Sequence, residues 1–273
     1  MQCTSPFVPT GKLALFGIRI PCGRCMACRI NKTKEWTLRL QHELKYYRHS
    51  FFLTLTYDDF YLPLDGSLEK VCFQKFMKRF RKYVGCEIKY FAVGEYGELN
   101  QRPHYHAIVL GWRPNDLFFV REKDDRKIFS SRVIGRLWPY GENTCGSVEH
   151  DSIQYVVGYV RKKLDGDQAQ EIYGKKVRPF ALMSKGIGLR YVQEHQAELQ
   201  EKLRITVKGQ SQKIPRYYVE KAELSKLRME ASSNRHLAKL AEEYDKPKNS
   251  EMTLVKQLYQ EDANLKSKFE RRK

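Results

Sequence analysis

The feature that most constrains the fold of this chain is an apolar run at residues 104–111. Successive side chains of a β-strand point to opposite faces of the sheet. On a strand, His104, His106, Ile108 and Leu110 share one face, and the mostly apolar residues between them share the other. Apolar residues on both faces are typical of a strand in the middle of a sheet. The run therefore predicts a central strand that carries two histidines on one face.

The segments around this run predict further strands. Residues 88–95 form a second apolar run, and the sequence Tyr-Gly-Glu-Leu-Asn-Gln-Arg-Pro between the two runs is typical of a longer hairpin loop. Residues 51–57 are β-branched and aromatic, which predicts a buried strand, and one more strand is expected near residues 146–149.

Three helices are expected from apolar residues at helical spacing. Their expected N-terminal caps are small polar residues, namely Asn31 or Thr33, Ser67, and Asp151 or Ser152. The second helix is expected to run through about Tyr83, which shares its apolar face, and the third through Leu164. The order strand, helix, strand, strand, helix predicts an α+β fold with a central antiparallel sheet flanked by helices.

The chain is expected to divide into three regions. Residues 1–50 hold a cluster of cysteines and a helix, residues 51–190 hold the strands and the chemical motifs, and residues 191–273 form a charged, helical C-terminal extension. A break is expected at Lys246-Pro-Lys-Asn-Ser, before a last helix.

The charge of the chain indicates an anionic partner. Lys and Arg number 50 against 32 Asp and Glu, which gives a net charge of +18. Such an excess is most often found in proteins that bind nucleic acid, although a merely basic, solvated surface gives the same balance. No apolar run approaches the roughly 20 residues that span a bilayer, and the first residues lack an export signal. We therefore expect no membrane contact and a cytoplasmic location.

The two histidines of the central strand are candidate metal ligands. Side chains two residues apart on a strand point the same way, so the imidazoles of His104 and His106 converge, and imidazole is the commonest transition-metal ligand. An ion that acts on phosphate also needs a hard ligand. Antiparallel pairing brings Glu95 beside His104, so Glu95 is the expected third ligand and Glu98, in the loop, the reserve. The alternatives are two structural histidines at a sheet end and solvated carboxylates.

A second candidate site is the run Tyr155-Val-Val-Gly-Tyr159-Val-Arg-Lys162-Lys163. The spacing alone is weak, because 17 tyrosines give about one such pair by chance and Tyr57 with Tyr61 repeats it. Helical geometry favours the later pair. The apolar residues of residues 153–164 lie on one face of the helix, and Tyr155, Tyr159 and Lys162 fall on the opposite side.

This arrangement suits a tyrosine nucleophile. A phenol has a pKa near 10, and a neighbouring cation favours the reactive phenolate. A metal ion polarises a phosphate and orients it for attack. Attack by the tyrosine on a phosphodiester gives a covalent phosphotyrosine, which conserves the bond energy for rejoining.

The third candidate site is the run Cys22-Gly-Arg-Cys25-Met-Ala-Cys28. Chance gives about 0.2 Cys-x-x-Cys pairs in a chain with seven cysteines, and this run holds two. Three thiolates, with Cys3 as a fourth, suit a closed structural zinc site. An iron–sulfur cluster and free buried cysteines are the alternatives. The odd number of cysteines and the missing export signal argue against a disulfide framework.

Taken together, these motifs resemble a known family. His104-Tyr-His106 is similar to the HUH metal motif of rolling-circle replication initiators, and Tyr155 with Tyr159, followed by lysines, resembles their two-tyrosine nucleophile motif. The sequence Phe52-Leu-Thr-Leu-Thr-Tyr57 resembles their first conserved strand. The cysteine run with Trp36, Arg39 and Glu43, and the sequences Gly94-Glu-Tyr-Gly97 and Met183-Ser-Lys-Gly-Ile-Gly188, resemble the replication initiators of microviruses, the gokushovirus-like phages. The resemblance runs from Cys3 to about residue 190.

The resemblance implies an HUH catalytic domain at residues 51–190, related to the RRM or ferredoxin-like fold, with Mg²⁺ or Mn²⁺ held by the histidines. It implies nicking and rejoining of single-stranded DNA at a viral origin, through a 5′-phosphotyrosyl intermediate in rolling-circle replication. Tyr155 and Tyr159 are then the nucleophiles, and Lys162 or Lys163 an electrostatic helper. The implied partners are origin DNA and host replication proteins, in the cytoplasm of a bacterial host.

Two other classes of function fit part of the sequence. A sheet-based, non-catalytic protein that binds single-stranded nucleic acid explains the basic charge and the aromatic residues. A DNA-packaging protein of the virion explains the charge but neither the histidine pair nor the tyrosines.

Overall fold

A computed structural model of the chain describes residues 2–10, 19–97, 100–123, 126–162, 167–207 and 209–228, together with residues 230, 231, 234, 235 and 238. The chain separates into two compact units, Met1–Val8 with Arg19–Lys226, and Pro9–Ile18 with Leu227–Lys273. All the elements named below belong to the first unit. Within the described residues, no helix is long and apolar enough to cross a membrane.

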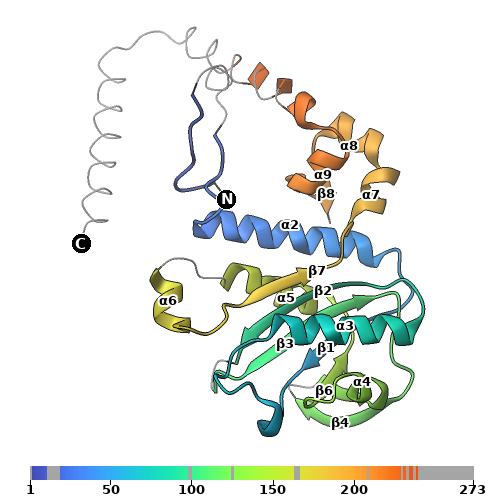
Figure 1. Ribbon diagram of the computed structural model, residues 1–273. Helices are drawn as coiled ribbons and strands as arrows, with labels where there is room; N and C mark the ends of the chain where they lie inside the picture. Colours follow the sequence, from blue (N-terminus) through green and yellow to red (C-terminus); the bar gives the residue numbers. More distant parts are fainter. Residues whose placement is uncertain are drawn as a thin grey trace. The chain divides into compact units, whose positions relative to one another are not determined.

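An antiparallel sheet forms the centre of this unit, and seven strands of it lie in the described residues (Figure 1). Every pairing between neighbours is antiparallel. In sheet order the strands are β4 (Leu117–Lys123), β5 (Arg126–Ser131), β6 (Asn143–Gly146), β1 (Ser50–Leu55), β3 (Pro103–Leu110), β2 (Lys89–Tyr96) and β7 (Phe180–Met183). The histidine-bearing strand β3 thus lies between β1 and β2, and the predicted central position is confirmed.

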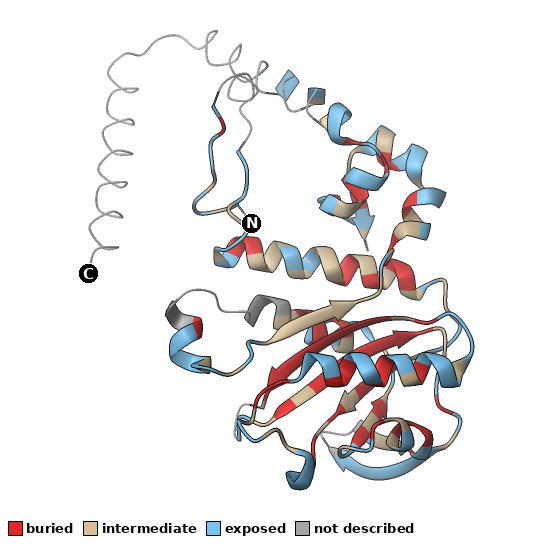
Figure 2. Ribbon diagram, in the orientation of Figure 1, coloured by how far each residue is buried: buried red, intermediate tan, exposed pale blue. Residues whose placement is uncertain are grey.

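Helices α3 (Lys70–Val84) and α4 (Arg132–Leu137) cover one face of the sheet. One side of α3 contributes Phe73, Phe76 and Phe80 to the core, which also takes Tyr105, Ala107 and Val109 from β3. Burial of these aromatic rings supplies most of the apolar contact on this face, at about 25 cal/mol per Å² removed from water. Figure 2 shows this buried strip along the strands and on the inner side of α3.

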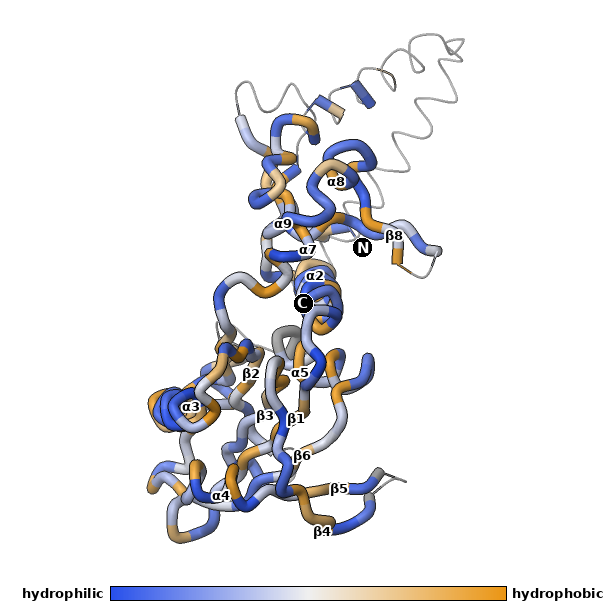
Figure 3. The backbone as a smooth tube through the Cα atoms, turned by 90° about the vertical axis from the view of Figure 1, so that its right-hand side faces the viewer, coloured by the Kyte–Doolittle hydropathy of each residue, from blue (hydrophilic) through white to orange (hydrophobic). Residues whose placement is uncertain are grey.

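Helices α2 (Met26–Leu44) and α5 (His150–Lys162) cover the other face. Ile153, Val156 and Val157 of α5 pack against Phe91 and Val93 of β2 and Ile108 of β3, and Leu40 of α2 joins them. In the view of Figure 3, α3 lies on one side of β2 and β3, and α5 on the other. The predicted α+β fold with a helix-flanked antiparallel sheet is therefore confirmed.

A third apolar cluster packs on the side of α2 that faces away from the sheet. It combines Leu38 of α2 with residues of α7 (Leu189–Glu194), α8 (Gln196–Lys202), the two-stranded sheet of β8 (Ile205–Val207) and β9 (Gln210–Gln212), and α9 (Arg216–Lys221). Tyr218 of α9 is fully buried there. Helix α2 therefore packs between two apolar clusters.

Several expected boundaries differ from the structure. Helix α2 begins at Met26, so Asn31 and Thr33 lie inside it. Helix α3 begins at Lys70 rather than after Ser67, and Tyr83 is 51% exposed. The strand expected at residues 146–149 lies at Asn143–Gly146.

The sequence did not predict the β4–β5 hairpin, α4, the β8–β9 hairpin, or the short elements η1 (Asp59–Tyr61) and α6 (Asp167–Tyr173). The break expected at residue 246 lies outside the described residues.

Candidate functional site

The pairing of β2 with β3 assembles a carboxylate and two imidazoles. In this register Glu95 is opposite His104, and Val93 is opposite His106. Because side chains alternate along each strand, Glu95, His104 and His106 all project from the face that α5 covers. The structure thus brings together the three residues that the sequence predicted as a group.

The three side chains converge on one carboxylate oxygen. Oε1 of Glu95 lies 2.9 Å from Nε2 of His104 and 3.0 Å from Nε2 of His106. The side chains of Glu95 and His106 are 5% and 8% exposed, and that of His104 is 17% exposed. This is the geometry of donors directed at a common point that remains accessible from one side.

The outer nitrogens of both imidazoles are held by other groups. Nδ1 of His104 lies 3.1 Å from the carbonyl oxygen of Arg102, and Nδ1 of His106 lies 2.9 Å from Oγ1 of Thr54. A carbonyl only accepts hydrogen bonds, so neutral His104 carries its proton on Nδ1 and presents the lone pair of Nε2 to Glu95. A lone pair facing a carboxylate oxygen is repulsive unless a proton or a metal cation lies between them. The donor set therefore fits a divalent cation.

The protonation states of the buried pair support this fit. Burial raises the pKa of Glu95, but hydrogen bonds from His104 and His106 outweigh it and leave the pKa below its ordinary value. Burial lowers the pKa of His106, and the nearby His104 lowers it further, against the opposing effect of Glu95. An ionised carboxylate beside a neutral imidazole is the form that binds a metal ion.

Helix α5 places two tyrosines beside this cluster. Oη of Tyr155 lies 3.5 Å from Nε2 of His106, and the hydroxyl of Tyr159 donates to Oη of Tyr155 at 2.8 Å. The Tyr159 ring is stacked near that of His106, with centroids 6.1 Å apart. The site therefore joins a carboxylate, two imidazoles and two phenols.

The geometry corrects one part of the helical prediction. Tyr155 is 48% exposed, as expected for a residue away from the apolar face. Tyr159, however, is only partly exposed and packs against the apolar cluster beneath α5. The reason is reach, since a phenol ring is long enough to fold back from the flank of the helix onto the sheet.

The other predicted site residues cannot be placed in this cluster. Lys162 ends α5, but its side chain lies outside what the structure describes, as do Lys163 and Glu98 as whole residues. The roles expected for them stay predictions.

The competing tyrosine pair has a different environment. Tyr57 is buried on the α3 side of the sheet, where its hydroxyl lies 2.9 Å from that of Tyr105. Burial raises the pKa of Tyr57 strongly, so its phenol is unreactive. Tyr61 is on the short helix η1 and is half exposed.

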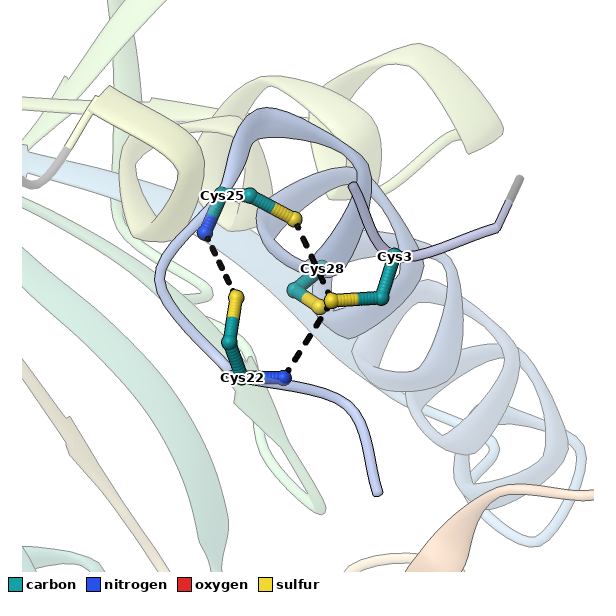
Figure 4. A group of neighbouring side chains, drawn as sticks. All are labelled: Cys3, Cys22, Cys25 and Cys28. Carbon is teal, nitrogen blue, oxygen red and sulfur yellow. Dashed lines mark hydrogen bonds between the residues drawn. The ribbon is translucent and has the colours of Figure 1, made fainter. Parts of the chain in front are cut away.

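The cysteines that the sequence singled out form a separate group at the start of α2 (Figure 4). Cys3, Cys22 and Cys25 are partly exposed, and Cys28 is buried. Hydrogen bonds from the backbone amides of Cys28 and Thr4 lower the pKa of Cys25 to about 5. Burial raises the pKa of Cys28 to about 12. All four predicted cysteines are therefore brought together.

Comparison with known proteins identifies the family. A family model that describes replication-associated proteins of the ORF2 type matches residues 50–164. The chain is 32% identical over 217 residues to replication-associated protein VP4 of Bdellovibrio phage phiMH2K, which covers 75% of this chain and 67% of that protein. The chain belongs to this replication-associated protein family. Residues 50–164 contain the carboxylate, both histidines and both tyrosines of the site.

Other members are similar over comparable lengths. The chain is 34% identical over 219 residues to replication-associated protein ORF2 of Spiroplasma virus 4, and 30% identical over 219 residues to replication-associated protein ORF4 of Chlamydia phage 1. These matches cover 73% and 74% of this replication-associated protein, but 66% and 53% of the relatives. The chain thus spans between about half and two thirds of these proteins. No solved structure matched it.

Two residues of the site were missed by the sequence reasoning. Thr54 pairs with His106 across β1 and β3, and the Phe52 ring lies stacked near the His106 ring at 5.6 Å between centroids. Alternation along residues 51–57 places Phe52 and Thr54 on one face. The signal that was lacking is the pairing of β1 with β3, which are separated by a helix and another strand.

A cavity beside Tyr159 extends the site of this replication-associated protein. It has a volume of about 230 Å³ and lies between α2, β2 and β7. Gly94 forms part of its wall, and a Cβ there would lie 2.9 Å from the Phe180 ring. The lining residues are Lys32, Trp36, Val93, Gly94, Tyr159, Pro179, Phe180, Ala181 and Met183. An exposed lysine and an aromatic wall suit a nucleotide, with a base on the rings and a phosphate on the ammonium.

Proposed function

We propose that this protein initiates phage DNA replication by nicking and rejoining single-stranded DNA through a tyrosine nucleophile. The observation that carries the proposal is the position of the Tyr155 hydroxyl, 3.5 Å from an imidazole of the carboxylate–histidine cluster. A phenol is a poor nucleophile at neutral pH, and a structure that places one at a candidate metal site supplies the activation that it lacks.

The relatives support the replication part of the proposal. All three are named replication-associated proteins of phages or viruses of bacteria. The net charge of +18 suits a protein whose substrate is a polyanion. We infer that the protein acts on DNA in the cytoplasm of the infected bacterial cell.

Glu95, His104 and His106 are the residues proposed to hold Mg²⁺ or Mn²⁺. The carboxylate is a hard ligand of the kind that both ions prefer, and two imidazoles favour Mn²⁺ over Mg²⁺. When bound, the ion supplies positive charge that polarises a phosphodiester and orients it for in-line attack.

In the proposed reaction, Oη of Tyr155 or Tyr159 attacks the scissile phosphorus. A new bond forms between phosphorus and Oη, and the bond between phosphorus and the 3′ oxygen breaks. The phenol proton passes to solvent, and the departing 3′ oxygen takes up a proton. The products are a 5′-phosphotyrosyl link and a free 3′-hydroxyl, and attack by a 3′-hydroxyl on that link restores the phosphodiester.

Two adjacent tyrosines give the site a second use. Because the hydroxyl of Tyr159 lies 2.8 Å from that of Tyr155, one phenol can hold the DNA end while the other attacks a new phosphodiester. Repetition of this exchange releases circles without a second copy of the protein. Lys162 and Lys163, next along the chain, are proposed to favour the phenolate.

The products determine the partners. A free 3′-hydroxyl is a primer end, so a host DNA polymerase and its accessory replication proteins are the proposed partners after cleavage. The proposed substrate is single-stranded DNA at the viral origin.

The test uses single-stranded oligonucleotides that tile the genome encoding this chain, incubated with the full-length protein and Mn²⁺. We expect cleavage of one oligonucleotide and a covalent protein–DNA adduct that peptide mapping assigns to α5. The variant with both Tyr155→Phe and Tyr159→Phe should bind the oligonucleotide but not cut it. Tyr61→Phe, which changes a half-exposed tyrosine outside the site, is the matched control.

Two outcomes would contradict the proposal. Undiminished cleavage by the double variant would exclude a tyrosine nucleophile on α5. Tight binding that survives EDTA, with no cleavage of any oligonucleotide, would instead indicate a non-catalytic single-strand binder.

A further inference from the structure

Four thiols meet where the N-terminal segment lies against the start of α2 (Figure 4). Cys3 comes from that segment, Cys22 and Cys25 from the loop before α2, and Cys28 from the first turn of the helix. The four Sγ atoms all lie within 4.8 Å of one another, and those of Cys25 and Cys3 are 3.8 Å apart. Neither the family match nor the proposed chemistry uses these residues.

These distances match a tetrahedral metal site. Zinc holds four thiolates at about 2.3 Å, which places neighbouring sulfurs about 3.8 Å apart. A disulfide requires sulfurs about 2.05 Å apart, and all four cysteines are free. We propose that Cys3, Cys22, Cys25 and Cys28 bind a structural Zn²⁺ ion that ties the N-terminal segment to α2.

The backbone before α2 is shaped to present the thiols. Gly23 has φ +75°, in the left-handed region that glycine adopts without strain, and this turn brings Cys22 back toward Cys25. The amide of Cys22 donates to Sγ of Cys3 at 3.3 Å, and the amide of Cys25 donates to Sγ of Cys22 at 3.4 Å. Amide donors directed at sulfur stabilise thiolates, the form that binds zinc.

The start of α2 supports the same conclusion. This helix has 19 residues, yet it has no side-chain cap and no acidic residue in its first turn. The exposed amides and the dipole at this end favour negative charge. Thiolates at Cys25 and Cys28 supply it. Arg24 and Arg29, in the same run, add positive charge that offsets the net charge of a four-thiolate zinc site.

The distant ligand is held in place by backbone pairing. Phe7 and Ile20 form an isolated antiparallel bridge, with both amides donating to the partner carbonyl at 2.8 Å. The bridge aligns the segment that follows Cys3 with the one that precedes Cys22. A thiol 19 residues away in sequence thus reaches the other three.

Zinc at this position has a structural consequence for the cavity beside Tyr159. Lys32 and Trp36, which line that cavity, follow Cys28 by one and two turns of α2. An ion that fixes the first turn of the helix therefore fixes one wall of the cavity. Its role is to hold this wall, not to take part in phosphate chemistry, since four thiolates leave no open coordination position.

The test measures metal directly in the full-length protein. We expect about one zinc per chain by mass spectrometry of the metal content, and less than about a tenth of that in the variant with both Cys22→Ser and Cys25→Ser. Cys86→Ser, at an exposed cysteine outside the group, should keep its zinc. Cys22→His should also keep it, because imidazole replaces a thiolate in such sites.

Replacement of the ion in the unchanged sequence gives a second readout that does not depend on a variant folding. Co²⁺-substituted protein should show the intense sulfur-to-cobalt absorption and visible bands of a tetrahedral four-sulfur site. Removal of the ion with a chelator should lower the thermal midpoint and expose residues 2–8 and 19–25 to proteolysis. Wild-type protein that folds without zinc, that binds iron in its place, or that gives an octahedral cobalt spectrum would overturn the proposal.

Discussion

The hydroxyl of Tyr155 lies 3.5 Å from Nε2 of His106, although the two residues are 49 positions apart in the chain. The contact exists because α5 packs on the face of the sheet from which the histidines project. It links a nucleophile to a candidate metal site, and it distinguishes the two tyrosines, because the hydroxyl of Tyr159 reaches His106 only through that of Tyr155.

This difference predicts separate roles for the tyrosines. We expect Tyr155→Phe to reduce the rate of the first cleavage by about a thousandfold or more, since no other phenol among the described residues lies as close to the cluster. Tyr159→Phe should retain the first cleavage within about tenfold but lose the second transfer. Single-turnover cleavage and strand-transfer assays on matched oligonucleotides separate the two steps. Equal losses in both variants would contradict the assignment.

Thr54 is expected to position His106 for metal binding. Its hydroxyl lies 2.9 Å from Nδ1 of His106, and the loss of such a partner weakens metal affinity by about 10- to 100-fold. Thr54→Val should therefore raise the Kd for Mn²⁺ by that factor in calorimetric titrations. Thr56→Val, two residues along the chain, is the control because its hydroxyl faces the carbonyl oxygen of Glu142 instead. An unchanged Kd in Thr54→Val would exclude the positioning role.

Lys32 is expected to contact a DNA phosphate at the cavity beside Tyr159. One lost phosphate contact on a single strand reduces the slope of log K against log salt concentration by about 0.7. Lys32→Ala should show that change in fluorescence titrations with a labelled oligonucleotide. Lys34→Ala removes an equal charge from an exposed position of α2 that does not line the cavity, so its slope should stay closer to the wild-type value.

Buried His42 predicts an acid-sensitive fold. Burial lowers the pKa of this histidine to about 4, and the nearby Lys45 and His195 contribute to the same shift. It stacks on Tyr191 and faces the hydroxyl of Tyr218. In the unfolded chain its pKa is near 6.5, so the unfolded state binds more protons between pH 6.5 and 4. The free energy of unfolding should therefore fall by up to about 3 kcal/mol as the pH falls through that window.

The check on this prediction is a set of urea unfolding curves from pH 7 to pH 4. His42→Asn lacks the titrating group, so its curve of stability against pH should be flatter by about the same amount. An identical pH dependence in both proteins would assign the acid sensitivity to other groups.

The sheet and the main site were predictable because their signals are local. Strand alternation placed His104 and His106 on one face, and the hairpin between β2 and β3 fixed Glu95 opposite His104. Three consecutive elements of sequence were enough for that. The spacing of Tyr155 and Tyr159 on a helix was equally local.

What the sequence did not predict depends on contacts between distant segments. The roles of Arg39 and Glu43 are examples, because Arg39 lies between the rings of Trp36 and Tyr217, and Glu43 forms a buried ion pair with Lys89 at 2.7 Å. Gly188 is another example, since a Cβ there would lie 2.5 Å from the Tyr218 hydroxyl. No periodicity within one segment reports such pairings.

Helix α2 packs on two sides, with Leu40 in the cluster beneath the sheet and Leu38 in the cluster built by α7, α8 and α9. A fragment limited to the strands and α5 would leave the first cluster without its cover, and one ending before α7 would leave the second face of α2 in water. The chemistry at Tyr155 is therefore not portable as a short module. Any transplant of this site into another protein has to carry both flanks of α2 with it, through α9.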